Sequence, residues 1–187
     1  MGRYRPPGPK SSKYITPEGA ARLRRELDHL WRTRRPQVTQ AVREAAAQGD
    51  RSENADYVYG KKQLAEIDRR VRYLRKRLEG MRIVDQAPSD PGKVYFGAWL
   101  ELCESTGARS RHRIVGPDES SAAPGYVSMD APLGRAVMGK ALGDEVAVRT
   151  PEGERRFTVT AISYTAPPDK KKPGILPGQS QGENESG

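Results

Sequence analysis

Two long stretches of the chain repeat apolar residues at intervals of three and four, the spacing of a helix that buries one face. The first runs from Thr16 to about residue 49, and the second from about residue 50 to Arg82. In the second stretch the two intervals alternate without a break, which is the pattern of a coiled-coil seam. Its members are Leu64, Ile67, Val71, Leu74, Leu78 and Met81. The pattern therefore predicts two long helices that pack along their lengths.

The two seams match when the second helix runs back beside the first. The residue numbers of facing pairs then add to a constant, as a hairpin with its bend near residue 50 requires. These pairs are Leu23 with Leu78, Leu27 with Leu74, and Leu30 with Val71. At a rise of 1.5 Å per residue, two arms of about 30 residues each predict a rod of roughly 45 Å.

Local signals set the expected ends of the two helices. Thr16 is a good N-cap, and Pro17 suits the first helical position. Pro36 lies inside the first helix, where it predicts a kink or a local defect. Gly49 is expected to end the first helix, and the second is expected to begin between residues 50 and 52.

From Lys93 onwards the apolar residues alternate with a period of two, which is typical of strands with one buried face. In the first such run, one face carries Val94, Phe96, Ala98, Leu100 and Leu102. Further strand-like runs cover residues 111–115, 126–129, 145–149 and 156–164. Between them, the sequence Asp130-Ala131-Pro132 is expected to cap a short helix that runs to about Met138. The fold class is therefore α+β: a long antiparallel coiled-coil hairpin, then a small domain with a mostly antiparallel sheet and one short helix.

Composition indicates where these domains begin and end. We expect a disordered basic arm at residues 1–13, the hairpin at 14–83, the sheet domain at 84–165 and a disordered tail at 166–187. The net charge of +9 favours a polyanionic partner, including a nucleic acid. A single cysteine, Cys103, excludes an internal disulfide. No apolar run approaches the roughly 20 residues of a membrane span, so we expect a cytoplasmic protein without a membrane partner.

The predicted bend carries the sequence Gly-Asp-Arg-Ser-Glu-Asn-Ala-Asp-Tyr at residues 49–57. Asp50 and Glu53 are three residues apart, so both carboxylates can lie on one side of a helix start. Paired carboxylates at a tip suit magnesium, which commonly takes one or two carboxylates and keeps several waters. The same spacing is also that of a capping box, with Asp50 as N-cap and Glu53 reaching back. The residues alone leave both interpretations open.

Other side chains near the bend suit contacts with RNA or with the walls of a channel. Arg51 can neutralise a phosphate, and Ser52 and Asn54 can cap the helix or orient water. Tyr57 and Tyr59 can stack on a base, or pack across the narrow end of the hairpin.

Basic residues crowd the second helix and are candidates for phosphate contacts. They are Lys61, Lys62, Arg69, Arg70, Arg72, Arg75, Lys76 and Arg77. For any one of them, an ordinary solvated helix surface explains the charge as well. His29 and His112 are far apart and have no clustered partners, so we expect no metal role for them.

The motif at residues 49–57, on such a hairpin, resembles the Gre transcript-cleavage factors of bacterial RNA polymerase, and the B type most closely. Further matching segments occur in the expected order along residues 14–164. They include Tyr14-Ile15-Thr16-Pro17-Glu18-Gly19, Leu30-Trp31-Arg32, Glu66-Ile67-Asp68-Arg69-Arg70, Phe96-Gly97-Ala98-Trp99 and Arg113-Ile114-Val115-Gly116.

The resemblance implies a sheet domain similar to FK506-binding proteins, which docks at the secondary channel of the polymerase. The hairpin would enter the channel, where Asp50 and Glu53 would hold a magnesium ion jointly with the polymerase. The polymerase would then cleave its own backtracked nascent RNA near the 3′ end. The chain would act as a monomeric elongation factor rather than as an enzyme.

Three other functions fit parts of the sequence. An inhibitory relative would occupy the same channel without stimulating cleavage, although its tip is expected to depart from the motif at residues 49–57. A prolyl isomerase is suggested only by the implied fold of the sheet domain, and no separate catalytic constellation supports it. A plain coiled-coil protein that binds RNA or DNA would be indifferent to changes at the tip.

Overall fold

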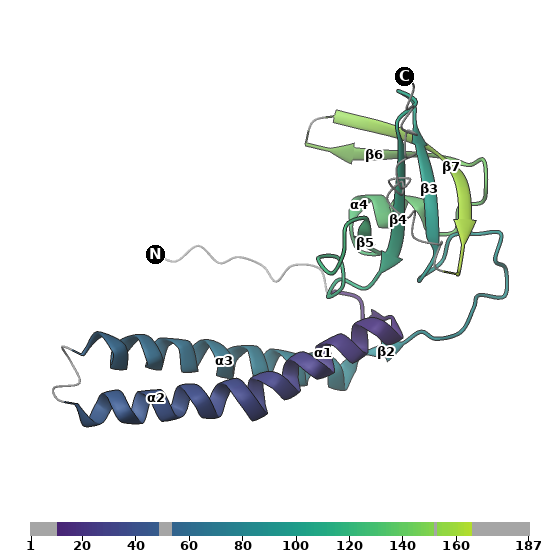
Figure 1. Cartoon of the computed structure of the whole chain (residues 1–187). Coiled ribbons are helices and arrows are strands. Elements are labelled where there is room, and N and C mark those ends of the chain that lie inside the picture. Colours follow the sequence, from purple (N-terminus) through teal and green to yellow (C-terminus); the bar gives the residue numbers. More distant parts are fainter. Residues whose placement is uncertain (1–10, 49–53, 152, 166–187) are drawn as a thin grey trace, which may run out of the picture.

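The computed structural model describes residues 11–48, 54–151 and 153–165, and shows a helical hairpin attached to a curled β-sheet (Figure 1). The first ten residues of the arm predicted at 1–13 and the whole tail predicted at 166–187 lie outside the described residues. The hairpin consists of α1 (Pro17–His29), a π-helical segment η1 (Leu30–Arg34), α2 (Arg35–Ala47) and α3 (Ala55–Gly80). The α+β class predicted from the sequence is confirmed.

The first arm of the hairpin begins, and departs from regular α-helix, where its sequence predicts. Thr16 is the N-cap of α1, and its hydroxyl oxygen accepts a hydrogen bond from the Gly19 amide at 3.0 Å. The π-helical segment ends at Arg34, two residues before Pro36, and the Arg35 amide donates to the Leu30 carbonyl five residues back. Proline has no amide hydrogen and its ring crowds the preceding turn, so the helix widens there. The local defect predicted at Pro36 is confirmed.

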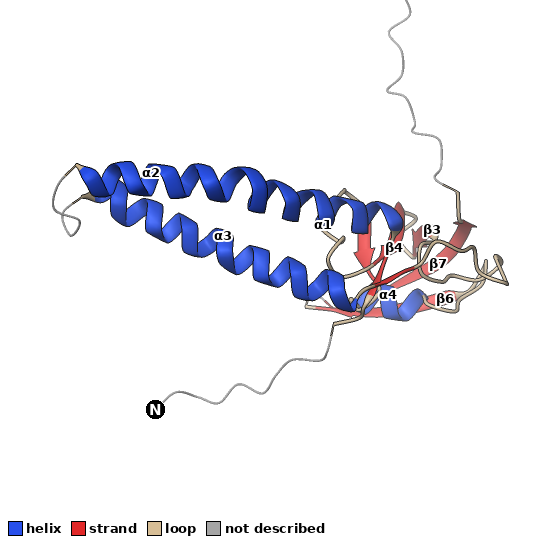
Figure 2. Ribbon diagram, turned by 90° about the horizontal axis from the view of Figure 1, so that it is seen from below, coloured by secondary structure: helices blue, strands red, loops and turns tan. Residues whose placement is uncertain are grey.

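The hairpin helices run antiparallel, side by side (Figures 1 and 2). Residues of the predicted seam are buried in two apolar clusters along them. At the base of the hairpin, Leu23 and Leu74 lie in one apolar cluster together with Ile15. Towards the tip, Val38 packs with Ile67 and Val71. The predicted partners share these clusters: Leu27 and Leu78 pack in the first with Leu74 and Leu23, and Leu30 packs in the second with Val71, in agreement with the constant sum of residue numbers.

Five strands form the sheet of the second unit, in the order β5-β4-β3-β7-β6. They are β3 (Trp99–Glu104), β4 (Arg109–Val115), β5 (Tyr126–Ser128), β6 (Glu145–Thr150) and β7 (Gly153–Ser163). All neighbours pair antiparallel except β4 and β5, which are parallel. The helix α4 (Pro132–Val137) packs against β5 and β6, and its Val137 joins the apolar core of the sheet.

Two sequence-based expectations for this sheet are corrected. The strand expected from Val94 begins only at Trp99, because Gly97 has a φ of +86° and interrupts the extended backbone. Phe96 therefore lies outside the buried core, and its ring packs against that of Tyr14 with centroids 6.0 Å apart. Asp130 does not cap α4: the N-cap is Ala131, which has no side-chain capping bond, and the Asp130 carboxylate accepts a hydrogen bond from the Ser12 amide at 2.8 Å.

A second, two-stranded sheet joins the two ends of the hairpin. β1 (Tyr14–Ile15) pairs in parallel with β2 (Arg82–Ile83). The Arg82 amide donates to the carbonyl of Lys13 at 2.8 Å. Residues 11–13, which the sequence assigned to a disordered arm, are therefore held in place, and the sequence pattern gave no sign of this pairing.

Candidate functional site

The end of the hairpin remote from the sheet is organised by Asn54. Its side-chain oxygen accepts a hydrogen bond from the Tyr57 amide at 3.1 Å, so Asn54 is the N-cap of α3. Its side-chain nitrogen donates to the carbonyl of Ala45 in α2 at 2.8 Å. One amide group thus caps the second helix and ties it to the end of the first.

This geometry corrects the predicted start of the second helix, which begins at Ala55 rather than between residues 50 and 52. The first helix ends at Ala47 with Gln48 as its C-cap, which agrees with a stop signal at residue 49. A carboxylate could accept from the Tyr57 amide, but it has no hydrogen with which to reach the Ala45 carbonyl. Asn54 meets both requirements, which confirms the capping role that the sequence allowed for it, and the N-cap of the second helix is Asn54 rather than Asp50.

The predicted metal-binding pair, Asp50 and Glu53, lies outside the described residues, as do Arg51 and Ser52. The chain positions of α2 and α3 place this segment between the two helix ends at Ala47 and Asn54. These ends form the part of the hairpin farthest from the sheet (Figure 1).

Aromatic and basic side chains follow the first turns of α3. Tyr57 is half-buried, and the Lys61 ammonium lies 5.3 Å from the centre of its ring. Tyr59 is 68% exposed. A cation over an aromatic face is attracted by the ring quadrupole, so Lys61 is held against the helix.

The basic residues of α3 separate into two groups. Lys61, Lys62 and Arg69 are exposed, and none of them has an ion-pair partner within the described residues. Arg70 instead forms two hydrogen bonds with Glu26, at 2.6 and 2.9 Å, and these raise the pKa of its guanidinium. Lys61, Lys62 and Arg69 are available for a polyanion, whereas Arg70, although also exposed, already has a carboxylate partner.

The aromatic ring of Trp31, at the π-helical segment, gathers two further arginines. The Arg75 guanidinium lies 4.3 Å from the centre of the indole ring and that of Arg35 lies at 5.2 Å. Arg35 also bonds to Asp68 at 2.8 Å. The widened helical turn before Pro36 thus coincides with a cross-helix contact between the two arms.

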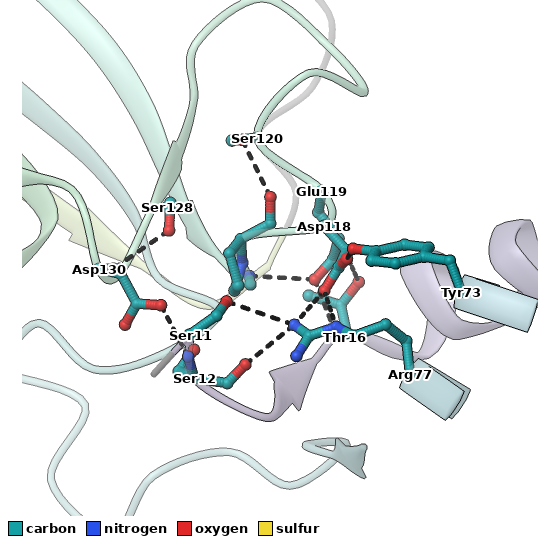
Figure 3. Close-up of polar contacts among 12 residues, drawn as sticks. Ser11, Ser12, Thr16, Tyr73, Arg77, Asp118, Glu119, Ser120, Ser128 and Asp130 are labelled. Carbon is teal, nitrogen blue, oxygen red and sulfur yellow. Dashed lines mark hydrogen bonds and ion pairs between the residues drawn. The ribbon is translucent and has the colours of Figure 1, made fainter. Parts of the chain in front are cut away.

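The hairpin meets the sheet through a loop after β4, and sequence reasoning missed its two acidic residues. Asp118 receives hydrogen bonds from Arg77 and, at 2.5 Å, from the Tyr73 hydroxyl (Figure 3). Burial and this hydrogen bond raise the pKa of Tyr73, and the bond to Asp118 raises the pKa of Arg77. The Arg22 guanidinium bonds the carbonyl of Asp118 at 2.8 Å.

Glu119, the neighbour of Asp118, is 1% exposed and contacts the start of α1. Its carboxylate accepts hydrogen bonds from the amides of Thr16 and Gly116, at 3.0 and 3.1 Å, and from the Thr16 hydroxyl (Figure 3). A Cβ on Gly19 would lie 2.1 Å from a carboxylate oxygen of Glu119, so only glycine fits there. Because about 100 residues separate these partners in sequence, no local pattern could have revealed the contact.

Within the described ranges, no three His, Cys, Asp or Glu side chains gather closely enough to hold a metal ion. His112 is half-buried, and the loss of solvent lowers its pKa. A search of the same ranges for a helix long and apolar enough to cross a membrane finds none.

The sequence matches two family models that together span most of the chain. "Transcription elongation factor, N-terminal" matches residues 13–83, and "Transcription elongation factor, GreA/GreB, C-term" matches residues 88–164. The chain belongs to the GreA/GreB family. This is a family of transcription elongation factors, so its members act as factors in transcription and not as enzymes in their own right.

Curated relatives of this GreA/GreB chain include two named transcription elongation factor GreB. The protein from Pseudomonas aeruginosa is 59% identical over 90% of this chain and 100% of its own length. The protein from Xanthomonas axonopodis is 55% identical over 89% of this chain and 99% of its own length. Among solved structures, GreA factor homolog 1 (Gfh1) of Thermus thermophilus is 27% identical, with a TM-score of 0.37, over 80% of this chain and 97% of that chain.

Proposed function

We propose that this GreA/GreB chain binds bacterial RNA polymerase at the secondary channel and stimulates cleavage of backtracked nascent RNA. The observation that carries the proposal is the position of the motif at residues 49–57. It joins the ends of α2 and α3, which form the part of the hairpin farthest from the sheet (Figure 1). A group at the end of a narrow rod can enter a channel that excludes a globular domain.

The rod has the length and attachment that such delivery needs. α3 has 26 residues, which corresponds to about 39 Å at 1.5 Å per residue. Asp118 and Glu119 hold its base against the sheet through hydrogen bonds to Arg77 and Thr16. If the sheet domain docks on the polymerase, these contacts set the direction in which the hairpin points.

The proposed chemistry rests on Asp50 and Glu53. Their carboxylates would hold a magnesium ion together with groups of the polymerase active site. Two metal ions can stabilise both the attacking and the leaving oxygen of a phosphodiester during hydrolysis. Two carboxylates alone are too few to enclose magnesium, which is why the proposed site is shared.

The remaining parts of the proposal concern partners and location. The exposed Lys61, Lys62 and Arg69 would attract the 3′ segment of the nascent RNA, and we keep contacts with DNA as a weaker expectation. The sheet domain, expected to resemble FK506-binding proteins, would dock on the polymerase. We expect the factor to act as a monomer in the cytoplasm, where bacterial transcription takes place.

The test is transcript cleavage by purified polymerase in backtracked complexes, across a magnesium titration. Asp50→Ala and Glu53→Ala should each abolish stimulation while competing with the wild type for polymerase as before. Glu66→Ala is the matched control, because it removes one exposed carboxylate from the shaft of α3. Full stimulation by both tip variants would refute the magnesium role. If the wild type binds polymerase but never stimulates cleavage, the chain is a non-cleaving regulator instead.

A further inference from the structure

A groove of about 500 Å³ lies between α2 and α3 in the half of the hairpin nearer the tip. This volume falls in the range of roughly 300–1,000 Å³ that is typical of small-molecule sites. The groove residues with apolar side chains include Val38, Ala41 and Ala45, and the polar and aromatic ones include Gln37, Gln63 and Tyr59.

The groove exists because its lining includes small residues. Gly60 faces Val42, and a Cβ on Gly60 would lie 2.6 Å from a methyl group of that valine. The helices therefore approach closely at this point, and Ala41 and Ala45 leave space beside the contact. Tyr59, the residue before Gly60, lines the groove and is 68% exposed.

Three polar side chains of the groove have no hydrogen-bond partner among the residues that the structure describes, whereas the Glu44 carboxylate accepts a hydrogen bond from Gln40 at 2.8 Å. The side-chain amides of Gln37 and Gln63 form no hydrogen bond with any residue in the described ranges, and neither does the Tyr59 hydroxyl. An amide offers both a donor and an acceptor, which is the combination found on the edges of nucleobases. An aromatic ring beside two such amides can therefore hold a flat, neutral, polar-edged ligand.

We propose that this groove takes one unstacked nucleobase of single-stranded RNA, with Tyr59 as the stacking platform and Gln37 and Gln63 as hydrogen-bonding groups. The proposal rests on the proposed function in one respect, since that function brings nascent RNA to the hairpin. It adds a binding site for the base, distinct from the phosphate contacts of the basic residues.

Charge favours a base over a phosphate inside the groove. Its charged lining residues are two acids, Glu44 and Asp56, and one base, Arg34, so the lining carries an excess of negative charge that disfavours a phosphate, whereas a nucleobase is neutral. Outside the groove, Lys62 follows Tyr59 by three residues and so lies on the same side of α3. The RNA backbone can thus contact the exposed Lys62 while one base enters the groove and stacks on Tyr59. The adjoining basic surface is also why RNA is preferred to a protein segment as the occupant.

The first experiment measures binding of a short labelled oligoadenylate to the full chain by fluorescence anisotropy at low salt. Tyr59→Ala should weaken binding by about five- to a hundredfold, as expected from the loss of one base–aromatic stack. Tyr59→Phe keeps the ring and should bind as the wild type does. Val58→Ala is the matched control, because Val58 is 53% exposed, adjacent in sequence and absent from the groove lining.

A second arm separates the base from the backbone. The same oligomer with abasic ribose in place of its nucleotides should bind wild type and Tyr59→Ala equally, because stacking is then absent from both. Equal binding of normal RNA by wild type and Tyr59→Ala would overturn the proposal, and so would an equal loss with the abasic oligomer. No RNA binding by the wild type, free or with polymerase, would overturn it too. Weaker binding of Tyr59→Ala to polymerase without RNA would assign the groove to a protein contact and overturn it as well.

These outcomes are distinguishable from failure of the proposed function. Asp50→Ala should lose cleavage stimulation and keep Tyr59-dependent RNA binding. A wild type that binds RNA through Tyr59 but never stimulates cleavage would refute the cleavage proposal and leave the base-binding groove standing.

Discussion

The buried carboxylate of Glu119 is the sharpest point at which to perturb the connection between hairpin and sheet. It accepts hydrogen bonds from the amides of Thr16 and Gly116 and from the Thr16 hydroxyl. Replacing Glu119 with alanine leaves all three donors without their acceptor. Replacing it with glutamine preserves the size of the side chain and one of the two oxygens. The two variants therefore separate the loss of hydrogen bonds from the loss of charge.

The expected magnitudes follow from these contacts. A buried donor left unsatisfied costs roughly 1–3 kcal/mol. For Glu119→Ala we expect a loss of about 3–5 kcal/mol in the free energy of unfolding. This is near the lower end of the total for three unsatisfied donors, because water can enter the space that the side chain leaves. In Glu119→Gln, the remaining oxygen can accept from both amides, and the new amide can donate to the hydroxyl oxygen of Thr16. Only the Thr16 hydroxyl then lacks its acceptor, and we expect a loss of about 1–2 kcal/mol.

The assay is urea denaturation followed by circular dichroism, with amide hydrogen exchange of Thr16 and Gly116 as the local measurement. Exchange at both amides should accelerate more in Glu119→Ala than in Glu119→Gln. Glu66→Ala, an exposed carboxylate of α3, should stay within about 0.5 kcal/mol of the wild type. The reasoning would be refuted if Glu119→Ala were as stable as Glu66→Ala with both amides still protected, or if glutamine cost more than alanine.

Two other perturbations test the tip and the sheet. Asn54→Ala removes both the N-cap of α3 and the bond to the Ala45 carbonyl, so it should cost about 1–2 kcal/mol of stability. Asn54→Asp can cap the helix but cannot donate, so its melting temperature should fall between those of Asn54→Ala and the wild type. Equal melting temperatures for all three would contradict the dual role. His112 has a pKa lowered by burial, so below its ordinary pKa near 6.5 the unfolded chain binds more protons than the folded one, and acidification should reduce stability until the pH passes below the folded pKa. His112→Gln should therefore lose less stability than wild type between about pH 7 and pH 5 in parallel thermal melts, and identical pH profiles would show that His112 is not responsible.

The contact at Asp118 and Glu119 also has a consequence for function. Hairpin and sheet are joined by groups that are buried or half-buried, so rotating one against the other would expose carboxylates and arginines that now satisfy each other. Truncating one partner of a buried charge pair costs more than removing an exposed pair, because the remaining charge stays desolvated. The hydrogen bonds and the ion pair of Asp118 and Glu119 thus help to maintain the direction of the hairpin.

The sequence alone determined the helical hairpin and most of the strands. Apolar residues recur along α3 at alternating intervals of three and four, so only one face of the helix can be buried. The residue numbers of facing positions add to a constant, so only one antiparallel register fits both helices. Thr16 and Pro36 act through their own backbone and side chain, so their effects on α1 and η1 were readable locally. The strands β4 to β7 were likewise evident from their period of two.

Only the tertiary structure decided which polar groups meet across the chain. Asn54 reaches a carbonyl of the other helix, and Glu119 reaches an amide 103 residues away. Such contacts depend on where two separately folded elements come to lie, and they leave no periodicity in either segment. The short pairing of β1 with β2 and the groove beside Tyr59 have the same origin. Local patterns specify which face each element buries, whereas packing between elements specifies which side chains meet.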